Sequence, residues 1–222
     1  MKKLLIALLL LPAIAFSQQL QINNIQDVMT LKNDIEGKYN AFDSSVKGSP
    51  FIHSELQNVT IQGLAMKGRY NANQDYIELD KDGKTVFFLP AIEYRYEVVF
   101  TDLNTTYQAF EYEKFKYGFF KILAKKENAF LLCKEFIKYK AEVKPKSTFE
   151  TYRAAKLERK KDTYYFKFSD QDLVVELPTS KSRFLKVFKN NASSIKSFIK
   201  KEKLSIKKKD DLVEIFKYYN TL

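Results

Sequence analysis

The sequence predicts an α+β fold: an antiparallel β-rich body, either a curved sheet or barrel-like, followed by two or three short C-terminal helices. Apolar and polar residues alternate over most of residues 58–177, as in antiparallel strands that bury one face. Helical spacing replaces this alternation over residues 180–220. Because a run of strands is followed by a run of helices, we expect the helices to lie on one side or end of the sheet.

Turn residues delimit the strands. Val59 and Ile61 start the alternation, and Asp82-Gly83 marks a tight hairpin turn, since these residue types tolerate the positive φ that such turns need. Residues 129–143 form an apolar run that is long for one strand, so we expect a bend or bulge within it. The other predicted strands are residues 69–71, 76–79, 85–89, 94–99, 110–112, 117–123, 163–168 and 173–177.

The predicted helices present apolar residues on one face and lysines on the others. Leu212, Ile215, Phe216 and Tyr219 occupy positions i, i+3, i+4 and i+7. Phe184 with Phe188, and Ile195 with Ile199, recur with the same helical spacing. Each helix spans only about ten residues, which is too short to persist alone in water, so each must pack against the sheet or its neighbours.

The chain divides into three parts. Residues 1–17 are typical of a secretory signal peptide, with two lysines, an apolar stretch and small residues before a cleavage site at Ser17/Gln18. Residues 18–47 are predicted to be a polar N-terminal extension, and residues 48–222 a single α+β domain. We therefore expect a periplasmic or secreted protein with no transmembrane segment after signal cleavage.

Positive charge is concentrated near the C-terminus. The chain has a formal net charge of +11, and residues 181–222 contain 12 basic and 4 acidic residues. Lysine supplies 33 of the 38 basic residues, whereas arginine makes the bidentate contacts that nucleic-acid recognition favours. We therefore expect no nucleic-acid partner. The alternatives are a solvated lysine-rich surface, or contact with an envelope protein or another anionic envelope partner.

Two groups of residues are candidates for an interaction surface. The long connection over residues 144–161 mixes aromatic and basic side chains, a composition typical of adaptable interaction loops, although a solvated linker has it too. The predicted helix near residue 198 adds lysines. The candidate residues are Phe149, Tyr152, Arg153, Lys156, Lys196, Lys200 and Lys203.

Residues for catalysis are scarce. His53 is the single histidine and is predicted to lie on the surface, while Cys133 lies in an apolar run and is predicted to be a buried thiol. Acidic residues gather over positions 75–82, but Glu78 and Asp80 alternate with apolar residues, as on the solvent side of a strand. We therefore predict no enzyme activity, no cofactor and no metal. Two converging acids between Asp75 and Asp82 would instead indicate a hydrolase.

Short motifs along the chain resemble a widespread family of exported bacterial proteins of unknown function. They comprise residues 48–51 (GSPF), 69–71 (RYN) with Glu78, 117–120 (YGFF), 164–165 (YY), 209–212 (KDDL) and 218–220 (YYN). Pro50-Phe51 departs from the pattern, which has an aromatic such as tyrosine at this place. The resemblance implies export and a β-rich body with a helical tail, and it implies no activity.

These features favour a non-enzymatic envelope protein that acts by binding. One alternative is a carrier that holds a small apolar ligand in a curved sheet or barrel. Another is an accessory subunit of an outer-membrane or secretion assembly.

Overall fold

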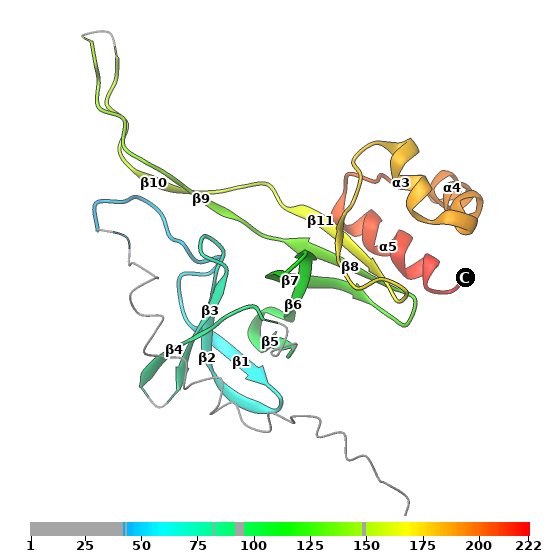
Figure 1. Ribbon diagram of the computed structural model, residues 1–222, viewed down its shortest axis with the longest axis horizontal. Helices are drawn as coiled ribbons and strands as arrows, with labels where there is room; N and C mark the ends of the chain where they lie inside the picture. Colours follow the sequence, from blue (N-terminus) through cyan, green and yellow to red (C-terminus); the bar gives the residue numbers. More distant parts are fainter. Residues whose placement is uncertain (1–41, 43, 82, 92–95, 148–149) are drawn as a thin grey trace, which may run out of the picture.

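A ten-stranded antiparallel sheet forms the body of the protein, and helices follow it along the chain (Figure 1). The computed structural model describes residue 42 and residues 44–81, 83–91, 96–147 and 150–222. The predicted signal peptide and cleavage site lie outside these residues. The strand order is β12-β11-β8-β7-β6-β5-β1-β2-β3-β4, so β12 and β4 are the two edges of an open, curved sheet. The predicted α+β fold class is confirmed.

Most strands lie where the alternation predicts them. The ten strands of the main sheet are β1 (Gln57–Ile61), β2 (Leu64–Asn71), β3 (Tyr76–Lys81), β4 (Lys84–Phe88), β5 (Val98–Phe100), β6 (Thr105–Glu113), β7 (Lys116–Lys125), β8 (Ala129–Lys134), β11 (Thr163–Phe168) and β12 (Val175–Glu176). A separate two-stranded sheet contains β9 (Ile137–Lys140) and β10 (Lys156–Arg159).

Two stretches differ from the predicted elements. The apolar run of residues 129–143 is divided into β8 and β9 at Glu135 and Phe136, in keeping with the expected bend. The connection predicted over residues 144–161 contains strand β10, which the alternation did not predict because most of its side chains are polar.

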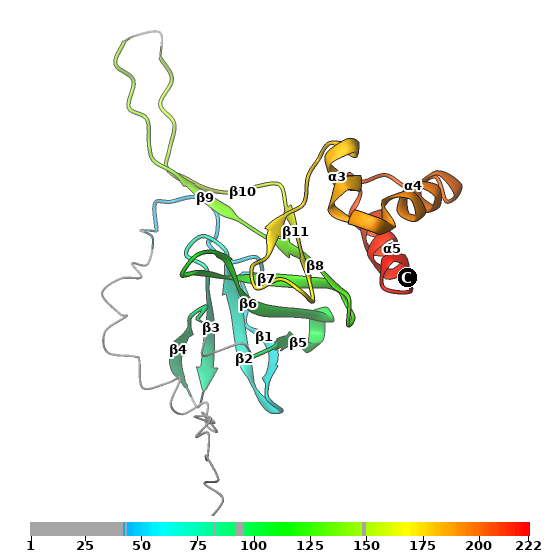
Figure 2. The same cartoon turned by 45° about the vertical axis from the view of Figure 1, so that its right-hand side comes forward.

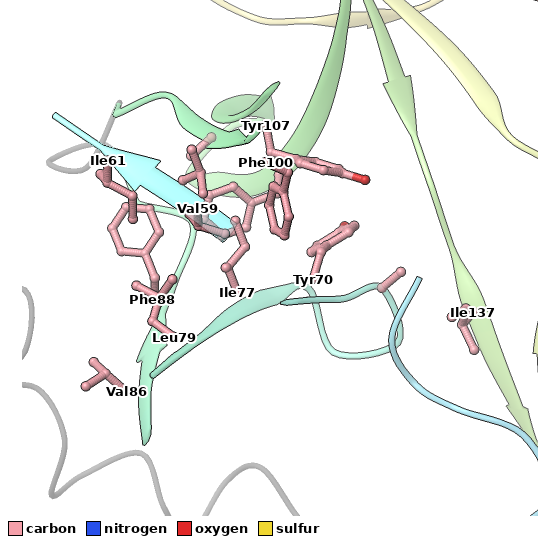
Figure 3. Packing of buried hydrophobic residues seen from close by; sticks show 14 of the residues in the cluster. Val59, Ile61, Tyr70, Ile77, Leu79, Val86, Phe88, Phe100, Tyr107 and Ile137 are labelled. Carbon is pink, nitrogen blue, oxygen red and sulfur yellow. The ribbon is translucent and has the colours of Figure 1, made fainter. Parts of the chain in front are cut away.

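The sheet curls strongly, so that strands far apart in its order meet across its concave side. The ring of Tyr70 in β2 lies 4.8 Å from that of Tyr107 in β6, and Phe88 in β4 lies 5.5 Å from Phe119 in β7 (centroid distances). Figure 3 shows the rings of Tyr70, Tyr107 and Phe88 packed among aliphatic side chains. This packing fills the interior with apolar side chains, which is the main source of stability in such a fold.

The β7–β8–β11 part of the sheet is covered on both faces. Leu131 packs in the cluster that includes the helices, whereas Leu132 packs with Phe120 in a separate cluster on the opposite face, and both leucines are 0% exposed. Successive strand residues point to opposite faces, so burial on both faces explains the continuous apolar sequence of β8.

The helices pack on this part of the sheet, away from β2, β3 and β4 (Figures 1 and 2). They are α3 (Lys181–Val187), α4 (Ala192–Lys201) and α5 (Lys209–Tyr219), with 3₁₀ turns η2 (Thr101–Leu103) and η3 (Lys189–Asn191) elsewhere. The predicted apolar face of α5 is buried, since Leu212, Ile215 and Phe216 are each 0% exposed.

Asn220 attaches the end of α5 to the sheet. Its Oδ1 accepts a hydrogen bond from the backbone N–H of Ala129 at 2.9 Å, and its Nδ2 donates to the carbonyl of Ala129 at 3.2 Å. Ala129 begins β8 and is fully buried. One side chain therefore satisfies both backbone groups of a residue that water cannot reach.

We expect Asn220→Ala to lower the free energy of unfolding by about 1–3 kcal/mol, because it removes the partner of the buried N–H of Ala129, whereas the carbonyl of Ala129 still accepts from the N–H of Lys126 at 3.3 Å. Urea denaturation measures this loss. Asn191→Ala is the matched control, since the Asn191 side chain makes no capping hydrogen bond at α4. Equal stability of the two variants would contradict the proposed role of Asn220.

Candidate functional site

Three of the seven predicted interaction residues lie on one long β-ribbon. β9 pairs with β10 in antiparallel register, and further out Val143 and Arg153 exchange two backbone hydrogen bonds of 2.8 and 3.0 Å. We call residues 137–159 the arm, because it projects from the body as an extended ribbon (Figures 1 and 2). Tyr152, Arg153 and Lys156 thus belong to the returning limb of a hairpin and not to a loop. Phe149 lies outside the described residues.

One face of the arm is apolar and continues the main core. Ile137 and Leu157 at its base are buried in the core cluster, and Tyr139 stacks on Phe42 with ring centroids 5.2 Å apart. Further out, the same face loses its cover: Tyr139 and Val143 are each 41% exposed. Arg153 is paired with Val143, so it lies on this face too.

The opposite face of the arm is charged. Lys140 and Lys156 both form ion pairs with Glu158, at 2.7 and 3.5 Å, and hydrogen bonds from Lys140 and Lys160 lower the pKa of Glu158 to about 2. Tyr152 is 54% exposed on this face, and its hydroxyl donates to Glu142. Lys138 and Arg153 form no ion pair with another described residue. The arm therefore keeps an excess of positive charge.

The lysines predicted on the helix form a second, separate surface. Lys196 and Lys200 lie exposed on α4, and Lys203 lies exposed just after it. α4 is part of the helical layer on β8 and β11, on a different side of the molecule from the end of the arm (Figures 1 and 2). The structure therefore divides the predicted interaction surface into an arm part and a helix part.

A pocket of about 480 Å³ lies at the base of the arm, and sequence reasoning did not find it. Its floor is the outer face of β2, β3 and β4. Its wall is formed by Leu157 of the arm and by Phe42, Ser44, Val46, Gly48, Pro50 and Phe51. The alternation in β2 and β3 could have indicated the floor, because Arg69, Asn71 and Glu78 point away from the core. The wall depends on contacts between residues distant in sequence.

The wall of the pocket is held against the arm by backbone hydrogen bonds. The N–H of Lys47 donates to Ala155 at 3.1 Å, and the N–H of Leu157 donates to Lys47 at 2.8 Å. Gly48 follows with φ of +95°, and a Cβ there would come within 2.7 Å of the carbonyl oxygen of Leu157. Glycine is therefore the residue that allows both this backbone conformation and this close approach.

The turn between β2 and β3 is fixed by a mostly buried ion pair. Asp75 accepts hydrogen bonds from Lys134 of β8 at 2.6 Å, from the Tyr70 hydroxyl at 2.8 Å and from the backbone N–H of Phe119 at 3.2 Å. Burial lowers the pKa of Lys134, and Asp75 acts in the opposite direction. A Cβ at Gly118 would lie 2.8 Å from both charged groups, so glycine leaves room for the pair.

The acidic residues near this turn do not converge. Asp75 bonds to Tyr70 and Lys134, Glu78 pairs with Arg69 at 2.8 Å, and Asp80 accepts from the backbone of Gly83. Tyr70, the partner of Asp75, and Arg69, the partner of Glu78, are neighbours in β2 and therefore point to opposite faces of the sheet. Asp82 lies outside the described residues.

The single histidine and the single cysteine of the chain are not part of the pocket lining. His53 is exposed, as expected. Cys133 is buried, as predicted, and burial raises the pKa of its thiol well above the usual range. Within the described residues, no group of three or more His, Cys, Asp or Glu side chains is placed to hold a metal ion.

Comparisons with protein-family models, with curated protein sequences and with solved structures found no match. In the part of the chain that the structure describes, no helix has the length and apolar character needed to cross a membrane. Among the residues quoted for the resemblance, Gly48, Pro50, Phe51, Arg69, Asn71 and Glu78 line the pocket.

We expect Lys134→Met to destabilise the protein by about 2–3 kcal/mol, because it leaves the Asp75 carboxylate largely buried without its cation. Lys138→Met is the matched control on the exposed arm and should change the free energy of unfolding by less than about 0.5 kcal/mol. Chemical denaturation of both variants measures the difference. A Lys134→Met protein as stable as Lys138→Met would show that the ion pair does not fix the turn.

Proposed function

We propose that this protein is an exported, non-enzymatic envelope protein that acts by binding a partner protein through the arm. The observation that carries the proposal is the apolar face of the arm, where Tyr139 and Val143 are each 41% exposed beside the exposed Arg153 as the face continues outward from the core. Binding a partner removes exposed apolar surface of this kind from water, which lowers the free energy of the complex.

The composition of the arm supports a protein partner. Tyrosine and arginine are the residue types that contribute most to protein interfaces, and the exposed part of the arm carries Tyr139, Tyr152 and Arg153. The two-stranded ribbon holds these side chains on a fixed backbone, which reduces the entropy lost on binding. The arm has seven basic and three acidic residues, so the partner surface should be acidic.

Export rests on the predicted signal peptide. Mass spectrometry of the protein purified from its source should give the mass of a chain that begins at Gln18. A full-length chain that keeps its first 17 residues would contradict the proposed location.

The carrier alternative receives no support from the interior of the curled sheet. The rings of Phe88, Phe100 and Phe119, each at most 2% exposed, occupy the concave side (Figure 3 shows the first two). An accessory role in a larger assembly is a specific form of the proposed function, and the identity of the bound partner would separate the two.

A photo-crosslinking amino acid at position 152 should give a discrete adduct with one envelope protein in intact cells. The same amino acid at position 115 is the control, because Phe115 is also an exposed aromatic residue, at 78%, but lies in the β6–β7 turn. Identical crosslinking patterns from the two positions, or none from position 152, would contradict partner binding by the arm.

Shortening the arm should abolish the adduct without unfolding the body. Lys140 pairs with Lys156, so a two-residue Asn-Gly turn replacing residues 141–155 closes the hairpin at an existing register. The removed residues are mostly exposed, so we expect the melting temperature to change by only a few degrees. Because this variant lacks position 152, the photo-crosslinking amino acid is placed at position 139 in both the full-length and the shortened protein. An adduct of undiminished yield would place the partner elsewhere.

A further inference from the structure

The pocket at the base of the arm has the features of a ligand site, independently of the arm's proposed role. Its volume of about 480 Å³ lies within the usual range of small-molecule sites. The residues of its floor are neighbours across three strands: Arg69 pairs with Glu78, Glu78 with Phe87, and Asn71 with Tyr76. They stand on the outer face of the sheet, because Tyr70 and Ile77 between them are buried in the core.

Aromatic rings line the pocket. Tyr76 and Phe87 form an edge-to-face pair with ring centroids 5.0 Å apart, and Phe51 stands on the facing wall. The guanidinium of Arg69 lies 3.8 Å from the centroid of the Phe51 ring. These rings offer apolar contact area while the cation–π contact fixes one of them in place.

Asn71 presents a buried donor that no described residue uses. The residue is 1% exposed, and its Oδ1 accepts hydrogen bonds from the backbone N–H groups of Asn73 and Gln74 at 3.0 and 2.9 Å. These two bonds assign the amide orientation, so Nδ2 is the atom left over, and it makes no hydrogen bond to a described residue. Because Asn71 lines the pocket, a ligand bound there could accept a hydrogen bond from Nδ2.

Glu78 supplies a matching acceptor. Both hydrogen bonds from Arg69 go to Oε1, at 3.1 and 2.8 Å, and Oε2 accepts none from the described residues. Arg69 also donates to the carbonyl of Ser54 at 2.7 Å, which holds the ion pair in place. The pocket therefore combines a fixed acceptor with the fixed donor of Asn71.

The charge of the pocket identifies the class of ligand. Arg69 and Glu78 are the charged residues among its described lining, and they neutralise each other, although the whole chain carries a formal charge of +11. An anionic or cationic ligand would find no uncompensated partner there. The ligand that fits is uncharged, with an apolar face for the rings and groups that both donate and accept hydrogen bonds.

We propose that this pocket binds an uncharged sugar unit of a saccharide. A pyranose ring presents C–H groups on its faces and hydroxyls at its edge, and each hydroxyl both donates and accepts. Its face would lie against Phe51 or the Tyr76–Phe87 pair while hydroxyls bond to Asn71 Nδ2 and Glu78 Oε2. A peptide is the less favoured ligand, because recognition of an extended peptide relies on backbone groups at a sheet edge, whereas side chains supply the free donor and acceptor here.

Isothermal titration calorimetry of the purified full chain with cellotriose, maltotriose and chitotriose tests the proposal. We expect at least one trisaccharide to bind with a dissociation constant below about 1 mM. Phe51→Ala and Asn71→Asp should each weaken that binding at least about tenfold, since asparagine-to-aspartate keeps the Oδ1 acceptor and removes the Nδ2 donor. Phe115→Ala, which removes an exposed ring outside the pocket lining, should leave it unchanged.

Three results would overturn the proposal. The first is the absence of heat from all three sugars with a folded protein. The second is binding that Phe51→Ala and Asn71→Asp leave intact while thermal melting shows both variants folded. The third is tighter binding of an uncharged tetrapeptide, such as acetyl-Ala-Gly-Ala-Ser-amide, than of any sugar, which would assign the pocket to a peptide. If Phe51→Ala is unfolded, Phe51→Leu replaces it, and the same tenfold loss is expected.

Discussion

The contact of the β2–β3 turn with strands β7 and β8 is the constraint on which the rest of the structure depends. The sheet has two open edges, so its ladder hydrogen bonds alone do not close it. Asp75 at the turn reaches across the concave side to Lys134 and to the backbone of Phe119. Ala72, at the start of the same turn, accepts from the N–H of Ile137 at 3.1 Å. The ion pair and these hydrogen bonds therefore act together with the apolar core to hold the sheet in its curled shape.

Both proposed binding surfaces depend on that closure. The bond between Ala72 and Ile137 places the base of the arm beside the end of β2, so the apolar face of the arm continues the core and then leaves it. The same turn orients Asn71, because its Oδ1 accepts hydrogen bonds from the backbone N–H groups of Asn73 and Gln74. The arm and the pocket therefore share one support but present different chemistry: one is exposed and basic, the other concave and neutral.

The sequence predicted what local periodicity determines. The strand alternation, the buried faces of α4 and α5, and the buried Cys133 all follow from the spacing of apolar residues. β10 was missed because Leu157 is the single buried residue among its four, so the strand has no alternation of apolar and polar residues to read. The pocket was missed because its wall and floor meet only through tertiary contacts, such as that between Lys47 and Leu157. The sequence also did not predict that the arm residues and the helix lysines lie on two separate surfaces, because tertiary contacts place them.

Amide hydrogen exchange measured residue by residue tests the closure most directly. The N–H groups of Ile137 and Phe119 donate to the β2–β3 turn and not to a sheet ladder. If the turn closes the curled sheet, these two amides should exchange only through global unfolding, as slowly as the ladder amides of β7 and β8. Fast exchange at both positions, with the ladder amides still protected, would show that the turn is loosely attached. The β2–β3 turn would then not be what supports the arm and the pocket.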